Sequence, residues 1–104
     1  MKYFTQVSLI TYIEQLANLM QMLHNLDRDL NLVAFNETEK KIYYTIAYEV
    51  HNNGKCNISD VIESSGFSRS TVYKAIKAFE DKQMVRLIQS HADRREVYLD
   101  LITV

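Results

Sequence analysis

The sequence predicts a mainly α-helical chain with a small antiparallel β-hairpin near its C-terminus. Apolar residues recur at helical spacing through most of the first 83 residues, and the period changes to two after Met84. The 104 residues include no proline and only two glycines, so most of the chain should be regular structure. A chain of this length has room for one small core, and a partner subunit can add to its stability.

The first element is a long amphipathic helix over roughly residues 4–26. One row of apolar residues recurs at steps of four, three, four and three, as in the seam between two packed helices: Leu9, Ile13, Leu16, Met20 and Leu23. A second row beside it consists of Leu19, Met22, Leu26 and Leu30. We therefore expect residues 1–34 to be a dimerisation element with the first row at the interface. Burial of the helix wholly within its own domain is the alternative.

The next predicted helix starts at Asn36 and ends at Asn53-Gly54. Asn36 and Glu39 have the spacing of a capping box, and the Asn-Gly pair suits a left-handed exit. Its inner stripe should consist of Ile42, Ile46 and Val50.

Two further helices complete the helical part. Asn57 and Asp60 repeat the capping pattern before a short helix that Gly66 ends, and Ser68 caps the helix that follows. Two helices joined by a three-residue link with a glycine are typical of a helix-turn-helix.

After Met84 the residues alternate over 85–90 and again over 95–102, with the turn "HAD" between them. This pattern predicts a β-hairpin. One face of it should carry Val85, Leu87, Val97, Leu99 and Leu101.

The helix that follows Ser68 has an apolar face and a basic face. Its expected core residues recur at steps of three and four: Val72, Ala75, Ile76 and Phe79. The other face carries hydroxyl groups and cations, which suit contacts to phosphates and base edges. The candidate DNA-binding residues there are Ser68, Arg69, Ser70, Thr71, Tyr73, Lys74 and Lys77. Taken alone, such a face is typical of a solvated surface that binds nothing.

The order of the elements favours DNA binding over a merely solvated surface. A capped helix, a short helix, a glycine turn, a basic helix and a basic hairpin together make a winged helix-turn-helix, which we assign to residues 35–104. In such a fold the 68–82 helix occupies the major groove, and the wing, residues 90–95, reaches the minor groove.

The charge distribution agrees with this interpretation. Residues 68–95 contain seven Lys/Arg and three acids, whereas the rest of the chain has a net charge of −5. The overall charge of −1 therefore hides a basic segment, and an anionic partner would bind there.

Two segments also resemble a known family: "SGFSRSTVYKAIKAFEDKQMV" and "SHADRREVYLDLI". They stand where the MarR family of bacterial transcriptional regulators has its recognition helix and its wing. The resemblance covers about two-thirds of the chain, from Asn36 to Ile102. It implies that Asp93 braces the wing by pairing with a basic group and that Arg94 enters the minor groove. The register of a short turn leaves Arg95 as the other candidate.

The chain departs from that family in three places, one of which is that its final strand ends in Ile102-Thr103 rather than Leu-Thr. Members usually have glycine after the recognition helix, whereas this chain has Gln83, which leaves open whether it exits the helix in the same conformation. Members also continue into C-terminal helices that help to build the dimer and an effector pocket. This sequence ends at Val104, which leaves open whether the usual effector cleft forms, and it identifies no small-molecule effector.

No pattern indicates catalysis, a metal site or a cofactor. Cys56 is the single cysteine, and His24, His51 and His91 lie far apart. No nucleophile, base and orienting group have related spacings, and no glycine-rich phosphate loop is present. We therefore expect a protein that is not an enzyme and binds neither a metal nor a cofactor.

The chain has the features of a cytoplasmic protein. Polar residues interrupt any signal-peptide core at the N-terminus, no segment is apolar enough to span a membrane, and Cys56 cannot form an internal disulfide. Cys56 is expected to be a small packing residue; a redox-sensing thiol activated by Lys55 is the alternative.

Two functional hypotheses from different classes follow. The first is a sequence-specific transcriptional regulator, a homodimeric repressor that binds a palindromic operator in double-stranded DNA. The second is a winged helix used as a protein-interaction module, in which the basic face meets an acidic partner or the hairpin supplies a contact edge.

Overall fold

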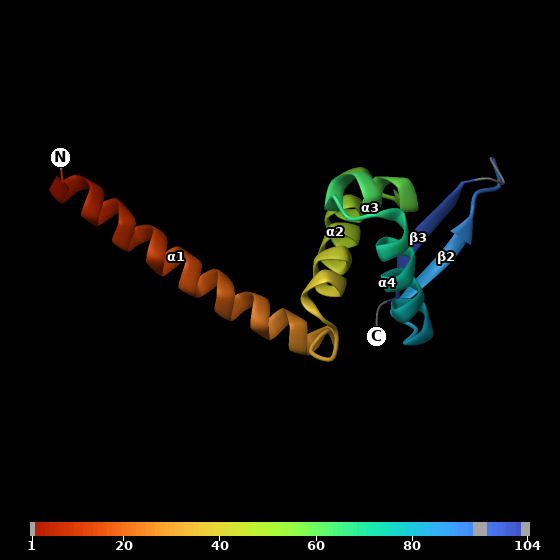
Figure 1. Ribbon diagram of the computed structural model, residues 1–104, viewed down its shortest axis with the longest axis horizontal. Helices are drawn as coiled ribbons and strands as arrows, with labels where there is room; N and C mark the ends of the chain where they lie inside the picture. The colour runs from red at the N-terminus through yellow and green to blue at the C-terminus, as the bar shows by residue number, and fades with distance from the viewer. Residues whose placement is uncertain (1, 93–95, 103–104) are drawn as a thin grey trace. The chain divides into compact units, whose positions relative to one another are not determined.

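The computed structural model describes residues 2–92 and 96–102, with side chains from residue 8 onward (Figure 1). The chain divides into two compact units, Met1–Phe35 and Asn36–Val104. The first contains α1 (Lys2–Asp29), and the second contains α2 (Glu37–Asn53), β1 (Cys56–Asn57), α3 (Ile58–Ser65), α4 (Arg69–Asp81), β2 (Val85–Gln89) and β3 (Val97–Leu101). The predicted fold class, mainly α with an antiparallel hairpin, is confirmed.

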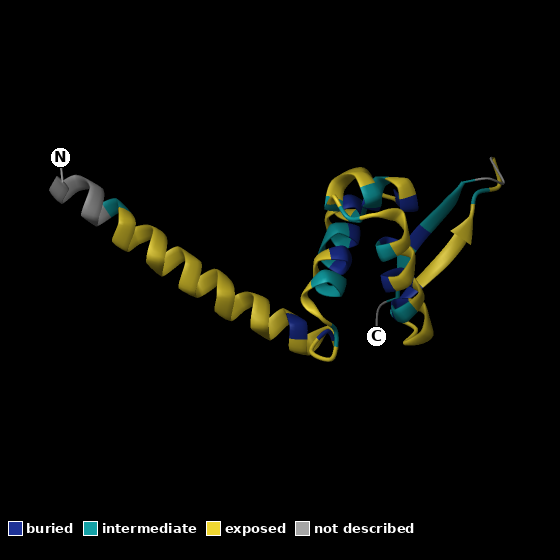
Figure 2. Cartoon of the chain, in the orientation of Figure 1, coloured by how far each residue is buried: buried dark blue, intermediate teal, exposed yellow. Residues whose placement is uncertain are grey.

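The first unit is built on the single helix α1, which is longer than predicted. It ends at Asp29, and the chain leaves it through Asn31, which has a left-handed φ of 60°. Asn31 N donates to Arg28 O (3.2 Å) and Leu32 N donates to Asp27 O (2.7 Å). Residues 2–35 form no second helix or strand, so within this unit the seam residues of α1 are exposed, from 38% at Leu23 to 65% at Leu16 (Figure 2). Among the described residues no helix is both long and apolar enough to cross a membrane.

The capping signals at the start and end of α2 are confirmed. Glu39 N donates to Asn36 Oδ1 at 2.8 Å, and Asn36 N donates to Glu39 Oε1 at 2.9 Å. Gly54 then ends the helix with a left-handed φ of 78°.

The signals around α3 and α4 are confirmed as well. Asp60 N donates to Asn57 Oδ1 at 2.8 Å, Gly66 ends α3 with a φ of 76°, and Ser68 Oγ accepts from Thr71 N at 3.3 Å. These caps set where each helix of the helix-turn-helix begins and ends.

The core of the second unit lies between its three helices and one face of the sheet. All four predicted core residues of α4 are buried, and the Phe79 ring meets the Tyr43 ring edge-on at a centroid distance of 5.4 Å. On α2, Ile42 and Ile46 are fully buried as predicted, but Val50 is only half-buried. Glu49 takes the inner position instead, because Asn53 Nδ2 (2.6 Å) and Ser64 Oγ of α3 donate hydrogen bonds to its carboxylate.

The sheet has three antiparallel strands in the order β1-β3-β2. Val85 pairs with Leu101 and Leu87 with Leu99, so the predicted apolar residues do share one face of the hairpin. Only Val85 and Leu99 are buried, whereas Leu87 is 38% exposed. The sequence interpretation missed β1, whose two residues pair with Leu99 and Tyr98 of β3.

The chain leaves α4 through a left-handed residue, although glycine is absent there. Gln83 has a φ of 59°, Gln83 N donates to Glu80 O at 2.9 Å, and Met84 N donates to Phe79 O at 2.9 Å. This pair of hydrogen bonds is the Schellman arrangement that a glycine usually completes. The open question about this exit is thus answered: Gln83 adopts the glycine conformation despite its Cβ.

Replacing Gln83 with glycine should stabilise the domain. A residue with a Cβ pays roughly 1–2 kcal/mol in the left-handed region, and the extra chain entropy of glycine offsets part of that gain. We expect Gln83→Gly to add about 1 kcal/mol and to raise Tm by about 4–8 °C in thermal unfolding followed by circular dichroism. Lys82→Gly is the matched control, because Lys82 has a φ of −91° and gains nothing from glycine. An unchanged or lower Tm for Gln83→Gly contradicts the strain argument.

Candidate nucleic-acid interface

The outer face of α4 is oriented by its buried inner face. Because Val72, Ala75, Ile76 and Phe79 all point into the core, α4 cannot rotate about its axis without exposing them. The predicted contact residues on the opposite side are exposed, with Tyr73 at 46%: Arg69, Ser70, Tyr73, Lys74 and Lys77. None of the residues in the first three turns of α4 is acidic. The structure thus presents hydroxyl groups and cations together at the N-terminal part of the helix.

Two of the predicted contact residues serve the helix start itself. Ser68 Oγ accepts from Thr71 N and donates to Thr71 Oγ1 at 2.8 Å, and it lies 3.3 Å from Ser70 Oγ. Thr71 is also half-buried. The side chains of Ser68 and Thr71 therefore have a structural task that the sequence alone assigned only to Ser68.

The tip of the predicted wing, with Asp93, Arg94 and Arg95, lies outside the described residues, so their assigned roles stay predictions. Hydrogen bonds link the described residues next to the tip. Ser90 N donates to Glu96 O at 2.9 Å, and Ala92 N donates to Ser90 Oγ at 3.2 Å. β2 and β3 thus bring residues 90 and 96 together at the base of the tip.

A cross-strand ion pair, which the sequence interpretation missed, stabilises the hairpin. Arg86 Nη2 on β2 lies 2.8 Å from Asp100 Oδ2 on β3, and the two residues are direct partners in the strand register. Both side chains are substantially exposed, so the pair contributes at most about 1 kcal/mol. Opposite charges seven places either side of residue 93 are the signal, but using it requires the strand register to be known.

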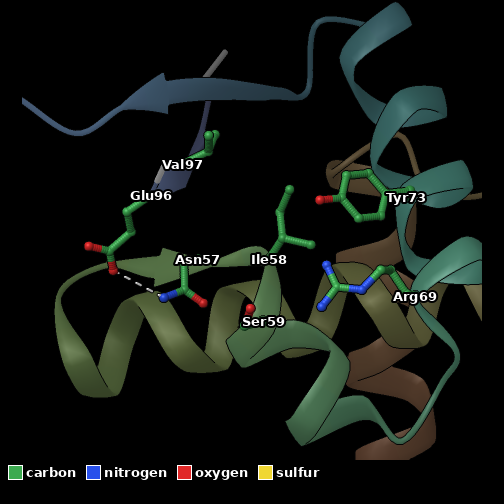
Figure 3. A pocket seen from close by; sticks show the side chains of 7 residues that line it. All are labelled: Asn57, Ile58, Ser59, Arg69, Tyr73, Glu96 and Val97. Carbon is green, nitrogen blue, oxygen red and sulfur yellow. Dashed lines mark hydrogen bonds between the residues drawn. The ribbon is translucent and has the colours of Figure 1, made fainter. Parts of the chain in front are cut away.

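The base of the wing meets the helix-turn-helix around a small pocket of about 160 Å³ (Figure 3). Arg69 and Tyr73 reach it from α4, and Glu96 and Val97 lie on its other side. The start of α3 forms the wall between them, with Asn57, Ile58 and Ser59. Two of the predicted DNA contacts are thereby brought beside the wing.

Cys56 is a packing residue, as expected, and its thiol is not activated. It is fully buried on β1, and burial raises its pKa to about 12, with Asp60 and Glu49 adding to the rise. The neighbouring Lys55 instead lies over the Tyr98 ring, with Nζ 4.8 Å from the ring centroid. A thiol with such a pKa stays protonated at neutral pH, which opposes the redox-sensor alternative.

No group of three or more His, Cys, Asp or Glu side chains suited to a metal ion occurs in the part of the chain that the structure describes. The exposed face of α4 carries hydroxyl groups and cations, and the base of the hairpin lies beside it. Such a surface can bind a polyanion, with the cations on phosphates and the hydroxyl groups on phosphates or base edges.

Comparison with known proteins agrees with this geometry. The family model described as sugar-specific transcriptional regulator TrmB matches residues 30–101, more than two-thirds of the chain. No curated protein sequence matches the chain significantly.

Several solved structures share the fold. BpsR of Bordetella bronchiseptica, whose DNA binding is regulated by 6-hydroxynicotinic acid, is 16% identical with a TM-score of 0.52, over 85% of this chain and 67% of that chain. PefR from Streptococcus agalactiae, bound to heme, is 18% identical with a TM-score of 0.57, over 90% and 63%. MepR of S. aureus, in complex with DNA, is 17% identical with a TM-score of 0.59, over 88% and 72%. The chain thus spans about two-thirds of the length of these proteins.

We expect two residues on the exposed face of α4 to differ in their effect on DNA binding: one sets overall affinity and the other sets preference among sequences. Lys77→Ala should weaken binding to all duplexes by a similar factor and reduce the slope of log affinity against log salt by about 1, because we expect the Lys77 ammonium to bind phosphate. Ser70→Ala should instead change the ranking of duplexes, at a cost of about 1–3 kcal/mol on the preferred one. Fluorescence anisotropy with a panel of duplexes measures both effects. If Lys77→Ala reorders the panel, or Ser70→Ala leaves its order intact, the assignments are wrong.

Proposed function

Because the chain belongs to the TrmB family of transcriptional regulators, we propose that it binds a palindromic operator as a homodimer, with α4 in the major groove and the wing in the adjacent minor groove. The observation that carries this proposal is the orientation of α4. Its buried inner face directs Ser70, Tyr73, Lys74 and Lys77 outward together. These are residue types that bind phosphates and base edges.

We further propose that the winged helix is of the MarR type. The wing segment "SHADRREVYLDLI" supports this assignment, with an acid and two arginines before a strand that the structure places at Val97–Leu101. Arg94 remains the proposed minor-groove residue and Arg95 the second candidate, with Asp93 as the proposed brace.

The effector is not part of this proposal. The solved structures with this fold are described with chemically different small molecules, 6-hydroxynicotinic acid for BpsR and heme for PefR. At 16–18% identity, the similarity to these proteins establishes a shared fold and not a shared ligand.

The exposed apolar surface of α1 supports the homodimer. Its seam residues have no partner in their own unit, and the helix carries a second apolar row beside the seam. Between Tyr3 and Leu26 the only Lys, Arg, Asp or Glu is Glu14, so charge repulsion between two copies is small. A two-fold dimer of this kind would present two α4 helices to half-sites about 34 Å apart, one helical turn of DNA.

One observation favours the interaction-module alternative. β2 lies at the edge of the sheet, and its Leu87 and Ile88 are 38% and 41% exposed. An exposed strand edge with apolar side chains can pair with an extended segment of another protein. This function needs no DNA, so duplex binding decides between the two.

Selection from random duplex DNA tests the proposed function. The protein should enrich a palindrome whose half-sites are centred about 10 base pairs apart. Recovered fragments without a common sequence, or no recovery above a bead control, would argue against sequence-specific binding and leave the interaction module as the better hypothesis.

The seam on α1 predicts the result of charge insertion. Leu16→Glu with Met20→Glu should convert the dimer to monomer in sedimentation velocity, because each protomer would bring two carboxylates into an apolar contact. Asn18→Glu with Gln21→Glu adds the same charge on the polar side of the helix and should leave the dimer intact. A dimer that survives the first pair shows that α1 does not use this seam.

A further inference from the structure

One side-chain hydrogen bond ties the base of the wing to the helix-turn-helix. Asn57 Nδ2 donates to Glu96 Oε1 at 3.3 Å (Figure 3). We propose that Glu96 is a positioning residue for the wing: this bond holds the hairpin at the orientation to α4 in which its tip reaches the minor groove. The inference rests on the proposed DNA-binding function.

Asn57 is held in place at the start of α3, so it can anchor a neighbouring element. Its Oδ1 accepts from Asp60 N at 2.8 Å, and its backbone N donates to Asp60 Oδ2 at 3.2 Å, so both its side chain and its main chain are held at the start of α3. The same side chain then has Nδ2 left to donate to Glu96. A single residue therefore caps α3 and holds the wing.

The pairing between β1 and β3 ends before it reaches Glu96. β1 is two residues long, and its last pair in the ladder is Asn57 with Tyr98. Glu96 lies two residues beyond that pair, about 7 Å nearer the tip at the rise of a β-strand. Its carbonyl also accepts from Ser90 N, so a hold on Glu96 is a hold on both arms of the hairpin.

Packing does not replace this bond on the side that faces α4. The pocket of about 160 Å³ lies there, between Glu96 and Val97 on one side and Arg69 and Tyr73 on the other. Glu96 itself is half-buried. A hairpin without the Asn57–Glu96 bond could therefore tilt toward or away from α4 at little cost in buried surface.

Because Glu96 is negatively charged, the direction in which its replacement changes DNA affinity distinguishes a positioning role from simple charge repulsion. An acid near the DNA-facing surface should repel phosphate, so its removal should strengthen binding if charge were all that mattered. A positioning role predicts the opposite for Glu96→Ala, which loses the acceptor. Glu96→Gln keeps an acceptor oxygen and removes the charge, so it should bind at least as tightly as the wild type.

A charge-conserving swap supplies the decisive variant. Asn57→Asp keeps the oxygen that caps α3 but replaces the donor with a second carboxylate facing Glu96. Combined with Glu96→Gln, it restores a donor and an acceptor with reversed polarity and leaves the net charge of the chain unchanged. The wild type, Asn57→Asp, Glu96→Gln and the double variant form a double-mutant cycle.

Affinity for the selected operator, measured by fluorescence anisotropy, should fall about three- to tenfold in Asn57→Asp and in Glu96→Ala, and should recover to within about twofold in the double variant. Hydroxyl-radical footprints should show minor-groove protection lost in the two weak variants and regained in the double one. Major-groove protection of guanine N7 should persist in all. Equal melting temperatures across the set exclude a folding defect.

Glu96→Ala binding as tightly as the wild type, or a double variant no better than Asn57→Asp, overturns the inference. If the wild type itself binds no duplex at low salt, the proposed function fails. If the wild type binds DNA but the effects of Asn57→Asp and Glu96→Gln on affinity simply add in the double variant, the role of Glu96 is refuted and the proposed DNA-binding function stands.

Discussion

The burial of Phe79 determines which face of α4 is exposed on the helix-turn-helix. This ring is fully buried against Tyr43 of α2, and together with Val72 and Ile76 it fixes the rotation of α4. Truncating such a ring costs about 3–5 kcal/mol, a large share of the stability of a small domain. The exposed residues of α4 face solvent because the opposite, apolar face of the helix is buried in the core.

Features that depend on short-range chemistry could be predicted from the sequence. The caps at Asn36, Asn57 and Ser68 need only residues three places apart, and all three form as expected. The inner face of α4 was predictable for the same reason, because a helical period fixes which side chains share a face. At the wing tip, residues 93–95 lie outside the described residues, and the roles predicted for them stay predictions.

Features that depend on contacts between distant segments could not be predicted in this way. β1 forms because Cys56 and Asn57 lie beside β3, some forty residues away, and nothing in their own sequence marks a strand. Glu49 is buried because Ser64 and Asn53 satisfy its carboxylate, although a charged residue is ordinarily placed outside. The sequence left the exit from α4 at Gln83 open, and the hydrogen bonds to the carbonyl oxygens of Glu80 and Phe79 show that it is the usual left-handed one.

We propose that a chain with a net charge of −1 binds DNA through a local basic surface. The most direct test is the affinity of the wild type for its selected duplex between about 50 and 200 mM salt. We propose that each half of a dimer places Lys74 and Lys77 on phosphates and a wing arginine in the minor groove, so six cations displace counterions and log affinity should fall against log salt with a slope of about −4 to −6. A slope near zero, or no affinity for any duplex at the lowest salt, would contradict the account.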